Sequence, residues 1–254
     1  MMAQPDSPRR GVAVSIRGVC RSYNGNEVLK DLDLEILAGE TMVIVGGSGQ
    51  GKSVLLRAIA GLEAADAGSI KVGELTVADY IATPPDKKPF HMSMVFQHSA
   101  LMGSMSVAEN VTLRLREHNT YDAARIDDIC AQALVEVEML EAKDKFPSEL
   151  SGGMKKRVAI ARALAVDPEI VLYDEPTAEL DPVLTSQMAV LIRRIQKEKG
   201  ITQVLVSHNL GLAYEVADRI ALLSQGLIVD LGSPEEIRSS PRTETREFVE
   251  ASKF

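Results

Sequence analysis

The sequence has no tryptophan, few aromatic residues (4%) and only two cysteines in 254 residues. Cys20 and Cys130 stand alone without metal-ligand spacing, which argues against a zinc site or a disulfide framework and favours reduced thiols in a cytoplasmic protein. No stretch approaches the about 20 apolar residues that a membrane span requires. The opening residues, MMAQPDSPRR, have no apolar run behind their charges, so we expect no secretory signal.

Positive charge is also in short supply. Lysine and arginine number 28 against 36 acidic residues, which gives a net charge of −8 and an isoelectric point near 5.2. This balance argues against a general nucleic-acid-binding or anionic-membrane surface. The hydrophobic share of 45% and the charged share of 25% are ordinary for a globular protein. A chain of this length can bury one sizeable core, with room for a smaller lobe.

Strand and helix patterns alternate along the chain. Residues 12 to 45 predict strands with a hairpin turn at Asn24-Gly25, and residues 98 to 166 are mostly helical in pattern. Other expected elements are a hairpin in GSIKVGELTV, a proline-rich seam between lobes at 83–90, buried strands at 42–46, 170–174 and 203–207, a helix at 183–198 and a helix-prone segment from 234. Strands that alternate with helices predict a parallel sheet with crossover helices.

A glycine-rich segment, GGSGQGKS, lies between a predicted buried strand and a helix whose apolar face holds Leu55, Leu56, Ile59 and Leu62 and which Gly61 ends. It fits the pattern G-x-x-x-x-G-K-[ST], in which backbone N–H groups and a helix N-terminus surround phosphate oxygens. Lys52 is expected to reach the β- and γ-phosphates, and the Ser53 hydroxyl to ligate Mg²⁺. The predicted ATP-binding residues here are Gly46, Gly47, Ser48, Gly49, Gln50, Gly51, Lys52, Ser53 and Val54.

Polar residues follow three further predicted strands. Asp174 and Glu175 end IVLYDE, where the first would hold Mg²⁺ through water and the second would act as general base. His208 follows QVLVS and suits a hydrogen bond to the γ-phosphate or the attacking water. Gln97 ends SMVFQ and is a candidate contact to Mg²⁺ or that water. Taken singly, these residues also read as an acidic helix cap, a capping histidine and a surface glutamine.

A second glycine turn, in ELSGGMKKR, opens another predicted helix. Ser151, Gly152 and Gly153 create a positively polarised helix end that calls for an anion. Because the first loop already completes one phosphate site, a γ-phosphate held by another subunit is a sensible target for this turn.

Five features resemble the ATP-binding-cassette (ABC) ATPases in their order and spacing: GGSGQGKS, Gln97, LSGGM, LYDEPTAELD and His208. The resemblance runs from about Val12 to Gly232. It implies an α/β fold, with a P-loop NTPase core built on a mixed, mainly parallel sheet, an antiparallel β subdomain and an α-helical subdomain. The implied boundaries are an ATPase domain at 11–233, with its helical subdomain at about 98–166, and a tail at 234–254 that is either a dimer contact or a fraying helix.

The same resemblance implies an ATPase that uses ATP and Mg²⁺ and works as a head-to-tail homodimer. Each ATP would lie between the first loop of one subunit and Ser151, Gly152 and Gly153 of the other, so that ATP closes a clamp and hydrolysis opens it. Tyr23 matches the aromatic residue that stacks on adenine, and Val28 the apolar residue beside it. Asp181 matches a loop that crosses the dimer interface, in which Glu179 stands where glycine is more common.

Met154 departs from the family pattern, which usually has glutamine there, and a thioether cannot make the hydrogen bonds of an amide. Two segments resemble those of the ATPases of Mla/Mce-type phospholipid and lipid transporters. They are LSGGM with its following basic pair, and MSMVFQHSALMGSMSVAENV upstream. This implies a peripheral protein at the cytoplasmic face of the inner membrane, with separate permease subunits and a lipid-binding substrate protein as partners and no nucleic acid. Leu101, Met102 and Met105 are candidates for a groove that receives a permease helix, or are simply core residues.

Three alternatives remain open on the sequence. The ATPase motifs do not separate a lipid transporter from an importer of a polar solute such as an amino acid. A soluble ABC ATPase of cluster assembly also fits, whereas the DNA-repair type would need a coiled-coil insertion between Gln97 and Ser151, and heptads are absent there. A small-molecule P-loop kinase would leave Ser151 to Gly153 unexplained.

Overall fold

The computed structural model describes residues 10–117 and 121–252. The expectation about a secretory signal falls almost wholly on residues outside these ranges. The strands are β1 Val14–Tyr23, β2 Asn26–Ile36, β3 Thr41–Val45, β4 Ala67–Val72, β5 Leu75–Thr76, β6 Met92–Val95, β7 Ile170–Asp174, β8 Thr202–Ser207, β9 Arg219–Ser224 and β10 Leu227–Gly232. The α-helices are α1 Lys52–Ala60, α2 Val77–Ala82, α3 Val107–Glu117, α4 Ala123–Glu136, α5 Gly152–Leu164, α6 Pro182–Lys199, α7 Leu210–Val216, α8 Pro234–Arg238 and α9 Thr243–Ala251.

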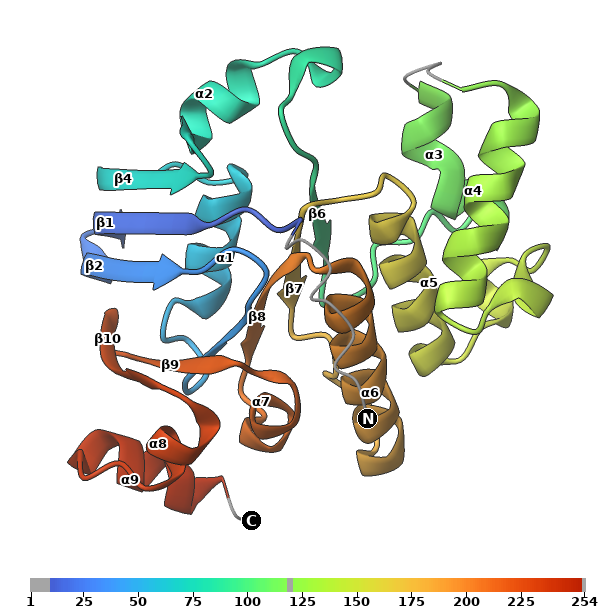
Figure 1. The fold of residues 1–254 in the computed structure, drawn as a ribbon. Helices are drawn as coiled ribbons and strands as arrows, with labels where there is room; N and C mark the ends of the chain where they lie inside the picture. The colour runs from blue at the N-terminus through green and yellow to red at the C-terminus, as the bar shows by residue number, and fades with distance from the viewer. Residues whose placement is uncertain (1–9, 118–120, 253–254) are drawn as a thin grey trace, which may run out of the picture.

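The strands form two sheets (Figure 1). The larger has the order β10-β9-β3-β8-β7-β6, and its strands are parallel except β10, which pairs antiparallel with β9. The smaller is antiparallel with the order β2-β1-β4-β5. The predicted mixed, mainly parallel core sheet and antiparallel β subdomain are therefore confirmed.

The position of β3 between two cores explains why residues 42–45 are all apolar. Met42 and Ile44 pack into one core, which lies between the two sheets and contains α1, while Val43 and Val45 pack into the other core with the helical lobe. Because successive side chains of a strand point to opposite faces, a strand buried on both faces has no polar alternation. Helix α1 and helix α5 consequently lie on opposite faces of the six-stranded sheet.

The predicted apolar face of α1 is right for three residues and wrong for Leu62. Leu55, Leu56 and Ile59 are fully buried, whereas Leu62 lies beyond the helix and is 60% exposed. The helix ends at Gly61, which adopts a left-handed conformation with a φ of 70°. Such a C-cap turns the chain out of the helix, so the residue that follows leaves the helical face.

The helical lobe is built from α3, α4 and α5, which pack against one another and through α5 against β6 (Figure 1). It lies within the predicted range of 98–166, but residues 98–106 form a loop before α3 begins. Cys130 is buried in this lobe, where burial raises the pKa of its thiol. Both cysteines are free.

The C-terminal segment folds back on the same chain. Ser233 caps α8 at the predicted boundary, and Ile237 is buried. Asp230 on β10 accepts hydrogen bonds from Ser240 and Thr245, the latter at 2.7 Å between Oγ1 and Oδ2. Residues 234–251 therefore form two packed helices, α8 and α9, in place of the fraying-helix alternative.

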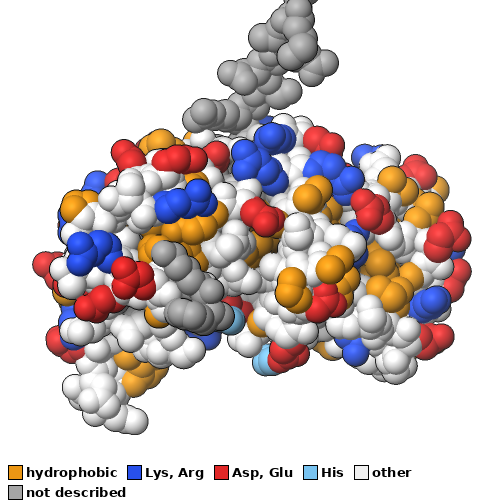
Figure 2. Space-filling view, turned by 90° about the horizontal axis from the view of Figure 1, so that it is seen from below, with side chains coloured by type: hydrophobic (Ala, Val, Ile, Leu, Met, Phe, Trp, Pro, Cys, Tyr) orange, Lys and Arg blue, Asp and Glu red, His pale blue; other side chains and the backbone are white. Residues whose placement is uncertain are grey.

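The described residues contain no helix that is both long and apolar enough to cross a membrane. On the face shown in Figure 2, lysine and arginine groups are interspersed with aspartate and glutamate groups.

Candidate active site

Four predicted site segments meet because of strand order. Strands β3, β8, β7 and β6 are parallel neighbours, so their carboxyl ends lie along one edge of the sheet. The glycine loop follows β3, His208 follows β8, Asp174 and Glu175 stand at the end of β7, and Gln97 follows β6. Ligands of open α/β sheets bind at this edge.

Lys52 holds the glycine loop from within. Its ammonium is buried and donates to the carbonyl oxygens of Gly46 at 2.8 Å and Gly47 at 2.9 Å. Burial lowers the pKa of Lys52, while the nearby carboxylates of Glu175 and Asp174 oppose that shift. The cap of α1 is Gly51, which provides no side-chain cap, so the N–H groups of the first turn are left for an anion.

Two glycines of the loop are required by close contacts. A Cβ at Gly46 would lie 2.3 Å from the Leu223 carbonyl oxygen, and one at Gly51 would lie 2.9 Å from the Val28 carbonyl oxygen. Gly51 also has a φ of 99°, which L-residues rarely adopt. The same contacts place Val28 directly against the loop, next to the position at which the sequence predicts a nucleotide.

A hydroxyl and a carboxylate meet beside the loop. Ser53 Oγ donates to Asp174 Oδ1 at 2.7 Å, and Asp174 is 7% exposed. Hydroxyl and carboxylate oxygens are hard ligands that suit Mg²⁺ bound together with substrate phosphates. The pair therefore fits the predicted metal site.

Glu175 lies between cationic and donor groups. Its Oε1 is 3.9 Å from Lys52 Nζ, and its Oε2 is 3.0 Å from His208 Nδ1. The same Oε2 accepts hydrogen bonds from the His208 backbone N–H and from Ser207 Oγ, each at 3.3 Å. Glu175 is 8% exposed and has a φ of 46°, a rare conformation for a residue that is not glycine. Contacts at both oxygens thus orient the Glu175 carboxylate. Ser207 is one of the residues that hold it, and the sequence did not indicate this role.

Gln97 lies at the same edge of the sheet, where its main chain is bonded to α5. Its carbonyl oxygen accepts a hydrogen bond from Lys156 of α5. Within residues 10–117 and 121–252, its side-chain amide has no hydrogen-bond partner and is half-buried, which leaves it available for a ligand.

The second glycine turn is separate from the first loop. Ser151 caps α5 and its Oγ accepts from the Met154 N–H at 3.3 Å, while Ser151 and Gly152 are exposed. In the described part of the chain, no hydrogen bond or ion pair joins this turn to residues 46–54. Two glycine turns that open helices therefore exist in one subunit without a hydrogen bond or ion pair between them.

The remaining predicted contacts lie at the ends of secondary-structure elements. Tyr23 ends β1, is 36% exposed and has the Arg21 guanidinium 4.7 Å from its ring centroid. Asp181 caps α6 by accepting from the Leu184 N–H at 2.9 Å. Glu179 has a φ of 67°, so this loop does use the left-handed conformation that makes glycine common at the position.

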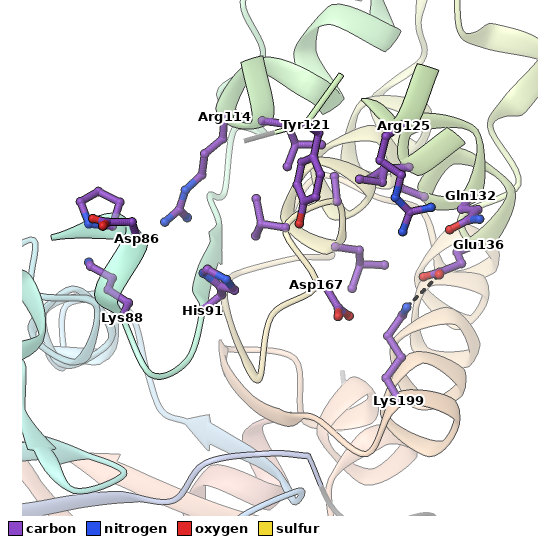
Figure 3. Close-up of a pocket in the computed structure, with 17 residues that line it drawn as sticks. Asp86, Lys88, His91, Arg114, Tyr121, Arg125, Gln132, Glu136, Asp167 and Lys199 are labelled. Carbon is purple, nitrogen blue, oxygen red and sulfur yellow. Dashed lines mark hydrogen bonds and ion pairs between the residues drawn. The ribbon is translucent and has the colours of Figure 1, made fainter. Parts of the chain in front are cut away.

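A sizeable cavity of the described residues lies elsewhere. It has a volume of about 790 Å³ and is lined by the loop before β6, by α3 and α4, and by the C-terminal ends of α5 and α6. Figure 3 shows Arg114, Tyr121 and Arg125 projecting into it from the helical lobe, with Lys199 joined to Glu136 at 2.8 Å. It adjoins the beginnings of β6 and β7, the sheet edge opposite the glycine loop, and contains none of the predicted site residues.

The fold and this constellation define a P-loop nucleoside triphosphatase. The ABC transporter family model matches residues 29–178, and the chain belongs to that family. Similar proteins include the probable ribonucleotide transport ATP-binding protein mkl of Mycobacterium leprae, 36% identical over 239 residues that cover 94% of this chain and 69% of that protein. The methionine import ATP-binding protein MetN of Campylobacter jejuni is 39% identical over 259 residues, which cover 95% of this chain and 76% of that protein.

Another relative is the sulfate/thiosulfate import ATP-binding protein CysA of Bacillus cereus, 38% identical over 91% of this chain and 64% of that protein. Among solved structures, the ATP-binding cassette MJ0796, a dimer in a post-hydrolysis state with ADP and phosphate, is 29% identical with a TM-score of 0.77. The match covers 87% of this chain and 98% of that one. The protein is thus the ATP-binding subunit of an ABC transporter, an ATPase that uses ATP with Mg²⁺, in a family whose ATPases dimerise and work with membrane permeases.

Proposed function

We propose that this subunit hydrolyses ATP at sites shared by two copies of itself and thereby drives phospholipid or lipid transport between membranes. It would act as a peripheral protein at the cytoplasmic face of the inner membrane, beneath separate permease subunits and with a lipid-binding substrate protein. The observation that carries the hydrolytic part is Glu175, which is held between Lys52 and His208 beside the Ser53–Asp174 pair.

Each residue has a distinct role in this proposal. Lys52 exchanges its loop carbonyl partners for the β- and γ-phosphates. Ser53, Asp174 and Gln97 would hold Mg²⁺, which would offset phosphate charge when bound. Glu175 accepts a proton from water as the water oxygen bonds to the γ-phosphorus. The bond from that phosphorus to the bridging oxygen breaks, and ADP carries the electron pair away.

Other residues orient the Glu175 carboxylate and hold the adenine ring. His208 and Ser207 keep Glu175 Oε2 in place by the contacts described above, so that Oε1 is the oxygen directed at the phosphates. Tyr23 stacks on adenine with Val28 beside it, and backbone N–H groups of residues 46–54 surround the phosphates.

The shared site is supported by the position of the second turn. Helices α1 and α5 lie on opposite faces of the sheet, and the α5 N-terminus with Ser151 and Gly152 is exposed. A positively polarised helix end gains from facing an anion, which a second copy's γ-phosphate provides. Asp181 would lie at the same interface. The C-terminal tail, residues 234–254, would provide a further dimer contact.

Mixed dimers test the sharing. Ser151→Arg removes the cap and fills the turn, and Lys52→Ala disables the first loop, so each pure variant should lose ATPase activity. A dimer with one copy of each variant should regain activity at one of its two sites, since one site then has an intact Lys52 and an intact Ser151. ATP hydrolysis by tagged, purified mixed dimers is the measurement.

The exposed Ser148, in the preceding turn, provides the control, because Ser148→Arg adds the same bulk without touching the α5 cap. Mixed dimers that stay as inactive as the pure variants would show that Ser151 serves its own subunit's ATP.

The lipid cargo rests on the resemblance of LSGGM and the basic pair to the lipid-transport branch. Met154 is half-buried and packs against the core shared with the helical lobe. A methionine in place of the usual glutamine is therefore accommodated within α5. The import ATPases among the relatives favour a polar solute as the second candidate.

Purification with native membrane partners distinguishes the two cargoes. We expect extracted phospholipid to co-purify and added phospholipid vesicles to raise the ATPase rate of the complex, whereas amino acids and sulfate should leave it unchanged. Stimulation by an amino acid through a soluble binding protein, without an effect of lipid, would assign the polar-solute function instead.

A further inference from the structure

The basic pair after Met154 consists of two unequal lysines. Lys155 is half-buried, and in the described part of the chain its ammonium has no hydrogen-bond or ion-pair partner. Lys156 is 6% exposed. Lysine is almost never buried to this degree unless its ammonium has a partner, because removing the charge from water is costly. The pair therefore contains one ordinary lysine and one that needs a specific explanation.

The partner of Lys156 is the main chain of Gln97. The ammonium donates to the Gln97 carbonyl oxygen and so joins α5 to the segment that follows β6. Six residues later on the same helix, Arg162 donates to the carbonyl oxygens of Ser99 at 2.8 Å and Ala100 at 2.7 Å. Residues 97–100, which we call the Gln97 segment, are thus held to α5 at three carbonyl groups.

The Gln97 segment has a backbone that needs such support. Ser99 has a φ of 61° and Ala100 a φ of 46°, both in the left-handed region that is unfavourable for residues other than glycine. Strained conformations persist where surrounding contacts over-determine them. The cationic groups of α5 supply those contacts.

The charge of Lys156 also faces the candidate active site. Burial lowers the pKa of Lys156, and the carboxylates of Glu179, Glu175 and Asp174 oppose the shift. The ammonium therefore lies within the field of the carboxylates at the end of β7. Towards the start of the helix, Lys156 is five residues from Ser151, or about 7.5 Å along the helix axis. One short helix thus connects Gln97 to the second glycine turn.

We propose that Lys156 is a positioning residue for ATP hydrolysis, because it fixes Gln97 against α5 and so makes Gln97 and Ser151–Gly153 move as one body. Lys156 itself touches no nucleotide. The inference rests on the proposed function, in which Gln97 faces Mg²⁺ and Ser151 faces the partner's ATP. Without the ammonium, the Gln97 carbonyl loses its only hydrogen-bond donor among the described residues, and the segment shifts relative to the carboxylates.

Lys156→Met in the complete transporter complex tests the proposal, since methionine fills much of the same space without a charge. We expect kcat for ATP to fall about 10- to 100-fold, as small displacements near a reacting group do. KM should stay within about twofold, because the phosphate loop is untouched. The melting temperature should change little, because relief from burying the charge offsets the hydrogen bond that the Gln97 carbonyl loses.

Two further variants separate positioning from a general effect on folding. Lys156→Arg keeps the charge and should restore part of kcat, and Lys155→Met is the matched control that should alter neither kcat nor stability. A fall in melting temperature that parallels the fall in kcat in both Lys156 variants would overturn the proposal, as would a normal kcat in Lys156→Met.

A double-mutant cycle with Gln97→Ala completes the test. Gln97→Ala alone should lower kcat, and adding Lys156→Met to it should cause little further loss, since both changes remove the same positioned amide. If Gln97→Ala lowers kcat but the two losses multiply, only the role of Lys156 is wrong. If Gln97→Ala leaves kcat intact, the proposed role of Gln97 is itself wrong and the role of Lys156 falls with it.

Discussion

Glu175→Gln is expected to lower the ATPase rate by at least about 100-fold while ATP still drives dimerisation. General bases contribute roughly 10²- to 10⁴-fold to enzymatic rates, and an amide cannot accept the proton of the attacking water. The variant keeps the size of the side chain, and its carbonyl oxygen can still accept from Ser207 Oγ and the His208 N–H. Removing the negative charge next to Lys52 should also favour bound phosphates.

Steady-state phosphate release and light scattering with saturating ATP and Mg²⁺ measure the two effects separately. The exposed Glu198 on α6 is the control position, and Glu198→Gln should leave both quantities as in the wild type. A Glu175→Gln protein that stays monomeric with saturating ATP would contradict the clamp, and one that keeps its turnover would remove Glu175 from the role of base.

Lys52→Ala is expected to weaken ATP binding itself, by roughly 100-fold, because the loop then loses the only cation that reaches the phosphates from within it. The variant also leaves the Gly46 and Gly47 carbonyl oxygens without their donor, so the loop loses its internal support. Calorimetric titration with ATP and Mg²⁺ reports the affinity directly. Lys71→Ala, on the exposed face of β4, is the matched control. Wild-type affinity in Lys52→Ala would place the nucleotide outside the glycine loop.

The sequence predicts the central part of the fold because the signals there are local. Apolar runs that end in glycine or in acidic residues identify β3 and β7, and the glycine loop predicts where α1 begins. Because alternating strands and helices predict parallel strands, the strand ends lie at one edge, and the gathering of Asp174, Glu175 and His208 follows from the topology. Their catalytic roles remain predictions.

Other features depend on contacts between distant residues and leave no local signal. The bond from Lys156 to Gln97 joins residues 59 positions apart, and the basic pair alone does not say which lysine is buried. Leu62 fits the helical spacing, but the left-handed Gly61 ends the helix before it. The packing of α8 and α9 depends on Asp230, whose hydrogen bonds to Ser240 and Thr245 need the β10 strand already in place.

The bonds from Lys52 to the loop carbonyls have a consequence for nucleotide affinity. Lys52 already shapes the loop from within, so under the proposed function a triphosphate would meet a preorganised loop and take over the ammonium from the carbonyl oxygens. The conformational entropy of ordering the backbone is then lost during folding and does not oppose binding. Under the proposed function, affinity for nucleotide would then depend partly on how stably the chain itself folds.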